Sequence, residues 1–208
     1  MTRRRFGRPL LAALLAAALA AGCAVGRPKT RFFTLGTVAP EAGAAIAPRP
    51  ELGLAVGPIE FPRYLDRPEI VTRDGAHRLV LSNANRWAGS LRSDVLRVVA
   101  DDLAALLGTA RITVFPNEPT FPLDYRVLLD LRELEGVPGD SVVLRARWTV
   151  VAGATGRAVA VEEAHVVEPA GSGTIEDYVA AQRLALARVS RDIATRIAGL
   201  PAPAVGAR

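Results

Sequence analysis

Two histidines and a pair of adjacent glutamates are the side chains best suited to acid–base or metal chemistry. His77 and His165 lie far apart in the sequence, and each is flanked by strand-like residues. A shared metal site would need a third ligand, which no motif identifies. Glu162-Glu163 lies close to His165 and could supply acid–base chemistry, but such pairs are far more common on solvated strands. We therefore interpret these four side chains as exposed strand residues.

The segment Gly171-Ser172-Gly173-Thr174 precedes an expected helix, where backbone amides could cradle an anion. A glycine-rich connection followed by a helix cap explains the same residues without a ligand. The sequence contains no GxSxG, P-loop, HExxH or GxGxxG motif. We therefore expect no enzyme activity, no catalytic residue, no metal site and no cofactor other than covalent lipid.

That lipid is expected on Cys23, the sole cysteine of the chain. Residues 1–8 are basic and residues 9–21 are apolar, which is the architecture of an export signal. The apolar stretch is shorter than the about 20 residues that a membrane-spanning helix needs. The run Leu19-Ala20-Ala21-Gly22-Cys23 resembles the lipobox of bacterial lipoproteins, although Ala20 departs from the preferred Leu. An ordinary secretory signal followed by a coincidental cysteine is the alternative.

The lipobox resemblance implies a signal peptide over residues 1–22 and a lipidated tether over residues 23–30. The acyl chains of a mature lipoprotein, such as palmitate, anchor it durably in a membrane. Because lipoproteins kept in the inner membrane commonly carry Asp after the cysteine, Ala24 favours the inner leaflet of the outer membrane. Residues 2–6 (TRRRF) also resemble a twin-arginine export motif, so the export route stays open.

Signal cleavage also changes how the charge is interpreted. The full chain of 208 residues has 26 basic and 21 acidic side chains and a pI near 10.3. Cleavage before Cys23 removes Arg3, Arg4, Arg5 and Arg8, which leaves 22 basic against 21 acidic residues. A nearly neutral domain is a poor polyanion binder, so nucleic acid is excluded as a partner. The content of 50% hydrophobic and 23% charged residues excludes a disordered chain, and one cysteine excludes a disulfide framework.

Two amphipathic helices are expected. Apolar residues recur at helical spacing from Ser90 to Leu107, and Gly108 is placed to end that helix. A second helix is expected from Thr174 to Ala198, with Thr174 as its N-cap. Pro201 begins an expected disordered tail over residues 201–208.

The remaining pattern predicts strands. Three long runs of period two indicate an antiparallel meander with one covered face: Tyr125–Leu134, Val142–Val151 and Ala158–Val167. Shorter strands are expected at Arg31–Leu35, Leu52–Ile59, Glu69–Thr72, Arg78–Leu81 and Ile112–Phe115, and those before the first helix suggest a sheet edge. The prediction is a single α+β domain over residues 31–200, with a mainly antiparallel sheet packed against two amphipathic helices.

Residues 61–73 (FPRYLDRPEIVTR) pack two prolines, an aromatic ring and several charges between two strands. This segment is followed by Asn85-Arg86-Trp87-Ala88 and the first helix. The two elements in this order resemble the ABC-type transport auxiliary lipoproteins, the family of paraquat-inducible protein C, a membrane integrity-associated transporter subunit. There a YLDRPxIVTR element precedes an RWAxxL helix start. Arg31-Phe32-Phe33-Thr34-Leu35 also matches that family's opening, and the resemblance runs from about Arg31 to Leu200.

The resemblance implies an outer-membrane lipoprotein that faces the periplasm. It would be a non-enzymatic accessory subunit of an MCE-type ABC lipid-transport system between the two membranes, supporting envelope integrity. The implied partners are an MCE-domain protein and the transporter's permease and ATPase, with self-association into a homo-oligomer as a further expectation. The alternative is a lipoprotein that itself binds a lipid or another envelope ligand in a groove between sheet and helices. The lipid that is moved, and its direction, are not encoded in any motif.

The candidate partner-binding residues are Arg63, Tyr64, Asp66, Arg67 and Arg73, since Arg and Tyr are frequent in interface hot spots. The competing interpretation is that these charges form internal salt bridges and that Tyr64 packs on the sheet. For Leu65 and Ile70 we expect internal packing. Trp87 is expected to be a core residue at the start of the helix, rather than a lipid contact.

Overall fold

The computed structural model describes residues 29–36 and 46–201. The predicted signal peptide, Cys23, most of the tether and all but the first residue of the predicted tail lie outside these ranges, so they stay predictions. The described residues from Arg31 onward belong to one compact unit. It contains two helices and eight strands within the described residues, which confirms the α+β class.

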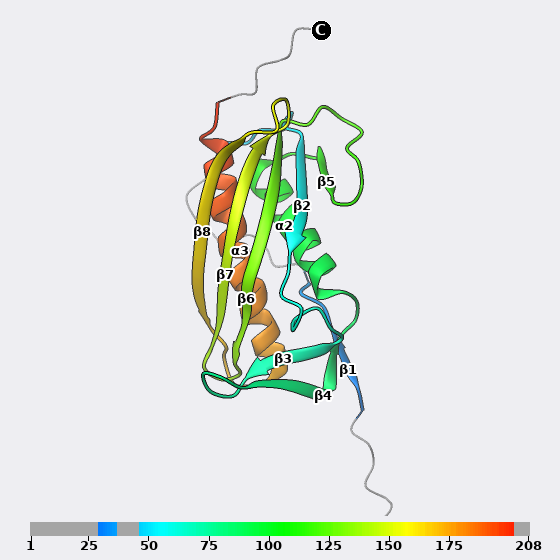
Figure 1. Ribbon diagram of the computed structural model, residues 1–208, viewed down its shortest axis with the longest axis vertical. Coiled ribbons are helices and arrows are strands. Elements are labelled where there is room, and N and C mark those ends of the chain that lie inside the picture. The colour runs from blue at the N-terminus through cyan, green and yellow to red at the C-terminus, as the bar shows by residue number, and fades with distance from the viewer. Residues whose placement is uncertain (1–28, 37–45, 202–208) are drawn as a thin grey trace, which may run out of the picture. The chain divides into compact units, whose positions relative to one another are not determined.

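The larger sheet has five strands in the order β5-β2-β6-β7-β8 (Figure 1). The strands β6 (Tyr125–Val137), β7 (Ser141–Ala152) and β8 (Ala158–Pro169) form the predicted antiparallel meander. The strand β2 (Leu54–Glu60) lies between β6 and β5 (Ile112–Val114) and is parallel to both. The position of β2 inside this sheet corrects the expectation that it belongs to an edge formed by the short strands.

The helices α2 (Leu91–Leu107) and α3 (Ile175–Ala198) cover one face of this sheet (Figure 1). Alternate residues of β6 and β7 point into the core, and Trp148 is 1% exposed there. Thr174 Oγ1 accepts the Asp177 amide, which confirms the predicted N-cap of α3, and Ser90 Oγ accepts the Ser93 amide at the start of α2. Gly108 ends α2 with a φ of 63°, a conformation that costs glycine little. The sheet therefore has one covered and one open face.

The second, smaller sheet has the order β1-β4-β3, from β1 (Arg31–Phe33), β4 (Leu79–Trp87) and β3 (Glu69–Arg73). β4 runs past its predicted end at Leu81 and reaches Trp87, because its last three residues pair in parallel with β1. Its first three residues pair with β3, and the register shifts between the two parts. Ser82 Oγ accepts hydrogen bonds from the Asn85 amide and side chain across this shift. The predicted short strands thus form a sheet of their own.

Neither helix in the described part of the chain combines the length and the apolar character that a bilayer crossing requires. Trp87 is 4% exposed and belongs to the core, as predicted. Leu65 and Ile70 are buried in the same core, which confirms the expected internal packing of these two residues.

Candidate functional site

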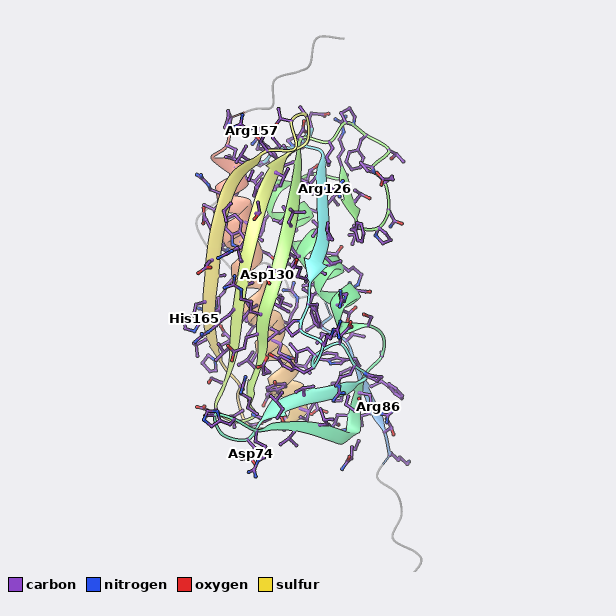
Figure 2. All side chains as sticks on the ribbon, in the orientation of Figure 1. Asp74, Arg86, Arg126, Asp130, Arg157 and His165 are labelled. Atoms are coloured by element: carbon purple, nitrogen blue, oxygen red, sulfur yellow. The ribbon has the colours of Figure 1, made fainter. Side chains whose placement is uncertain are left out.

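The side chains that suggested acid–base or metal chemistry do not converge. His77 lies exposed in the turn between β3 and β4, whereas His165 is exposed on β8 of the other sheet (Figure 2). Glu162 and Glu163 point to opposite faces of β8: Glu162 pairs with Arg196 of α3, and Glu163 pairs with Arg147 of β7. In residues 29–36 and 46–201, no group of three or more His, Cys, Asp or Glu side chains could hold a metal ion.

The glycine-rich turn before α3 is filled by a carboxylate of the chain itself. Asp177 Oδ2 accepts hydrogen bonds from the Ser172 amide at 2.9 Å and from the Ser172 hydroxyl. These hydrogen bonds lower the pKa of Asp177. A Cβ atom on Gly171 would lie 2.9 Å from this side chain, so the turn closes tightly around it. The backbone amide at Ser172 that could have bound an external anion thus binds Asp177.

The segment that carries the family resemblance is organised around Glu135 of β6, whose side chain is fully buried. Arg73 Nη2 lies 2.7 Å from Glu135 Oε1, and the Tyr64 hydroxyl donates to the same oxygen at 3.0 Å. The other carboxylate oxygen accepts the Leu134 amide at 2.9 Å. Burial and the neighbouring Glu135 raise the pKa of Tyr64, so its hydroxyl stays protonated and acts as a donor. We call these three residues the Glu135 cluster: Tyr64, Arg73 and Glu135.

Tyr178 of α3 connects the same region to the helix layer. Its hydroxyl accepts the Gly136 amide at 3.1 Å and donates to the Val71 carbonyl at 2.9 Å. Gln182, one turn further along α3, donates to the Leu134 carbonyl at 2.8 Å. Burial raises the pKa of Tyr178, so this hydroxyl is also a neutral donor. The Glu135 cluster and these two side chains join the smaller sheet, the larger sheet and α3.

The other charged residues of the segment lie nearer to the surface. Asp66 is exposed and forms an ion pair of 2.7 Å with Arg92 of α2. The guanidinium of Arg92 also lies 5.6 Å from the ring centre of Phe61, within the range of a cation–π contact. Arg67 is half-buried and Arg63 is exposed. Of the five candidate residues, Tyr64, Arg73 and Asp66 thus make contacts within the domain, while Arg63 presents its charge to solvent.

Sequence reasoning missed Glu135, Tyr178 and Gln182. The predicted β6 strand ended at Leu134, and the real strand contains a register shift between Leu131 and Glu133 that breaks the period of two. Beyond such a shift, the alternation of residue types no longer indicates whether an acidic side chain is buried or exposed. Tyr178 and Gln182 lie on the buried face of a correctly predicted helix, but their polar partners come from distant strands.

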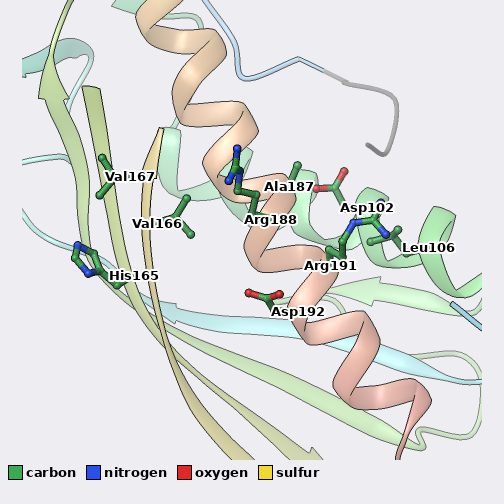
Figure 3. Close-up of a pocket in the computed structure, with 9 residues that line it drawn as sticks. All are labelled: Asp102, Leu106, His165, Val166, Val167, Ala187, Arg188, Arg191 and Asp192. Carbon is green, nitrogen blue, oxygen red and sulfur yellow. The ribbon is translucent and has the colours of Figure 1, made fainter. Parts of the chain in front are cut away.

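A cavity of about 340 Å³ lies between α2, α3 and β8 (Figure 3). Its lining contains both ionisable and apolar side chains: Asp102, Leu106, His165, Val166, Val167, Ala187, Arg188, Arg191 and Asp192. Arg188 of this lining also pairs with Glu168 of β8 at 2.8 Å. Such mixed walls suit water and small polar groups better than acyl chains.

Comparison with known proteins identifies the family. The sequence matches the ABC-type transport auxiliary lipoprotein component family over residues 33–194. A crystal structure of an uncharacterized protein aligns over 82% of this chain and 99% of its own, with a TM-score of 0.67 and 17% identity. A second crystal structure, of a Xanthomonas campestris protein from a family of unknown function, aligns over 81% and 96%, with a TM-score of 0.66 and 19% identity. These two share the fold, and no curated protein matches the sequence. The chain belongs to the family of ABC-type transport auxiliary lipoprotein components.

Proposed function

We propose that this protein is an outer-membrane lipoprotein, anchored through Cys23 and facing the periplasm, that acts as a non-enzymatic accessory subunit of an MCE-type ABC lipid-transport system. Family membership over residues 33–194 carries the proposal, because it makes the chain an auxiliary component of ABC-type transport and associates it with the envelope. The MCE-domain protein, the permease and ATPase, and a homo-oligomeric state are the finer parts of the proposal.

The filled interior supports an accessory role over the alternative, in which the domain itself carries a lipid. Both helices press their apolar faces onto the sheet, and one continuous cluster of buried residues fills the space between them. The cavity beside α3 has five ionisable groups in its lining and is small for a lipid with two chains. Organic extraction of the purified protein tests the alternative. Recovery of one non-covalent lipid per protein molecule would favour a lipid carrier.

Anchoring is tested by membrane fractionation. The Cys23→Ala variant should leave the membrane fraction, because the thiol is the only site for the lipid. The Ala24→Asp variant should keep its lipid and move from the outer to the inner membrane. A membrane fraction unchanged in Cys23→Ala would contradict lipidation, and an unmoved Ala24→Asp protein would contradict sorting to the outer membrane.

Partnership is tested by pull-down of the lipidated protein from envelopes after mild crosslinking. Recovery of an MCE-domain protein is expected, and its absence would count against the transport partnership. For the partner surface we propose the five segment residues, with Arg63 and Asp66 as its most exposed charges. Arg63→Glu together with Asp66→Arg should reduce recovery several-fold. Arg157→Glu, an exposed arginine in the turn between β7 and β8, is the matched control and should leave recovery unchanged.

A further inference from the structure

The smaller sheet exposes apolar side chains that the core does not use. Leu79, Val80 and Leu81 are consecutive in β4 and are 36%, 41% and 41% exposed. Because successive strand residues point to opposite faces, both faces of this part of β4 meet solvent. Phe32 of β1, at 66%, is the most exposed large apolar side chain among the described residues. A run of three exposed apolar residues is larger than the single exposed side chains that are normal on protein surfaces, and larger exposed apolar surfaces mark interaction sites.

These side chains lie on the sheet through which the chain enters the domain. β1 begins at Arg31, eight residues after Cys23, and an extended chain of eight residues spans at most about 29 Å. Phe32 pairs with Arg86 of β4, and Leu79 to Leu81 lie at the other end of that strand. Lipid on Cys23 therefore keeps Arg31, at the Phe32 end of the smaller sheet, within about 29 Å of the bilayer surface. This step rests on the anchoring proposed above.

The arginines of the smaller sheet are all ion-paired. Arg31, Arg78 and Arg86 are 54%, 71% and 44% exposed and pair with Glu176, Asp74 and Glu69. Arg73 turns inward to Glu135. Because these pairs neutralise the arginines, the exposed apolar side chains and the nearby anchor carry the proposal.

We propose that the smaller sheet docks on the lipid surface next to the anchor, with Phe32 and the segment Leu79–Leu81 inserted among the lipids. A fluid lipid phase can surround both exposed faces of β4, whereas a folded partner packs against one. The acyl chains keep the protein on the membrane, and the sheet fixes the orientation of the domain. The end of the larger sheet near Arg157, which lies opposite to the smaller sheet, then points away from the membrane (Figure 2).

The test uses the lipidated protein in vesicles of phosphatidylethanolamine and phosphatidylglycerol. Lipidation converts the sulfur of Cys23 into a thioether, which does not react with thiol reagents. A Val80→Cys variant of the lipidated protein therefore carries one reactive thiol for an environment-sensitive fluorophore. Val161→Cys is the matched control. Val161 is also an exposed strand valine, at 56%, and it lies near the start of β8, at the end of the larger sheet that is far from the smaller sheet (Figure 1). Phe32→Cys provides a second label position on the smaller sheet.

The labels at positions 80 and 32 should shift to the blue and be quenched several-fold more by spin-labelled lipids than the label at 161. Equal quenching at 80 and 161 would overturn the proposal. So would a blue shift at 80 that appears without vesicles and grows with protein concentration, which would assign the surface to a second copy of the chain.

The mass of the purified protein separates this proposal from the one it rests on. Absence of acyl chains on Cys23 would contradict the proposed anchoring and leave the docking surface to be measured independently. In that case the same labelled variants in a Cys23→Ser background are held on vesicles by an N-terminal histidine tag and a nickel-chelating lipid. Selective quenching at position 80 is again expected, and its absence there would overturn docking.

Discussion

The guanidinium of Arg73 lies 2.7 Å from the carboxylate of Glu135, and the glutamate side chain has no contact with solvent. Arg73 belongs to β3 of the smaller sheet and Glu135 to β6 of the larger one. The pair therefore joins the two sheets at the end where Tyr64 also donates to Glu135. Part of the segment that identifies the family thus maintains the architecture of the domain.

Replacement of Arg73 by Met should destabilise the protein strongly. The variant leaves the Glu135 carboxylate buried with no cation on it, and loss of one partner of a buried ion pair costs about 3 to 5 kcal/mol. Because Arg73 itself is partly exposed, we expect the lower end of that range. Urea unfolding followed by circular dichroism measures the change.

Arg145→Met is the matched control for that variant. Arg145 pairs with Glu133 at 3.3 Å on the open face of the sheet, where both partners meet solvent. Exposed pairs contribute about 1 kcal/mol or less. Equal losses of stability in the two variants would contradict the special role of the buried pair.

Asp177→Asn should make stability less dependent on pH in the acid range. Hydrogen bonds from the Ser172 hydroxyl and amide lower the pKa of Asp177 in the folded protein. The stabilisation is present above the ordinary Asp pKa of about 3.9 and is lost as pH falls through the lowered folded value. The wild type should therefore exceed the variant in stability at neutral pH, and the difference should shrink on acidification.

Thermal unfolding at several pH values measures this difference in stability. Ser172→Ala should give a smaller difference of the same sign, and a difference independent of pH would contradict the assignment.

Gly57→Ala should cost more than Gly75→Ala. Both glycines have positive φ values, 102° and 79°, which are unfavourable for alanine. A Cβ on Gly57 would lie 2.8 Å from Phe115 Cβ, whereas one on Gly75 would meet no atom within 4 Å. Such overpacking adds about 1 to 3 kcal/mol to the backbone strain. Denaturant midpoints of the two variants measure the difference, and equal midpoints would show that the contact at Gly57 relaxes freely.

Trp87→Ala should destabilise the protein by about 3 to 5 kcal/mol, because it leaves a cavity in the core. Trp87 is the last residue of β4 and pairs with Phe33, next to the exposed Phe32. Phe32→Ala is therefore the control, and an exposed site changes stability by about 0.5 kcal/mol or less. Calorimetry of the two variants compares the melting temperatures. A small loss for Trp87→Ala would contradict its core role.

Local signals in the sequence predicted both helices, the end of α2, the N-cap of α3 and the meander. Gly108 and Thr174 occupy the predicted cap positions, and these signals work because caps act on backbone groups a few residues away. The alternation in β6 and β7 likewise reflects the pleat of each strand. The class of fold and the family motif could therefore be predicted from neighbouring residues.

The pairing of the short strands could not be predicted in this way. The parallel contact of β1 with β4, and the placement of β2 between β5 and β6, join residues far apart in the chain. Which edges meet depends on how the sheets and helices share one core, so no window of sequence contains the information. The separate smaller sheet follows from this packing.

For the candidate site, the sequence by itself determined that residues 61–73 are special and that Cys23 follows an export-signal pattern, because both are local patterns of residue types. Only the tertiary structure decided that Arg73 and Tyr64 turn inward, because their partner Glu135 is brought to them by the packing of β6 against the smaller sheet. It also decided that Leu79 to Leu81 stay exposed, because no element of the described chain covers that part of β4. Burial is a property of the assembled fold, and residue type sets only the cost of being buried or exposed.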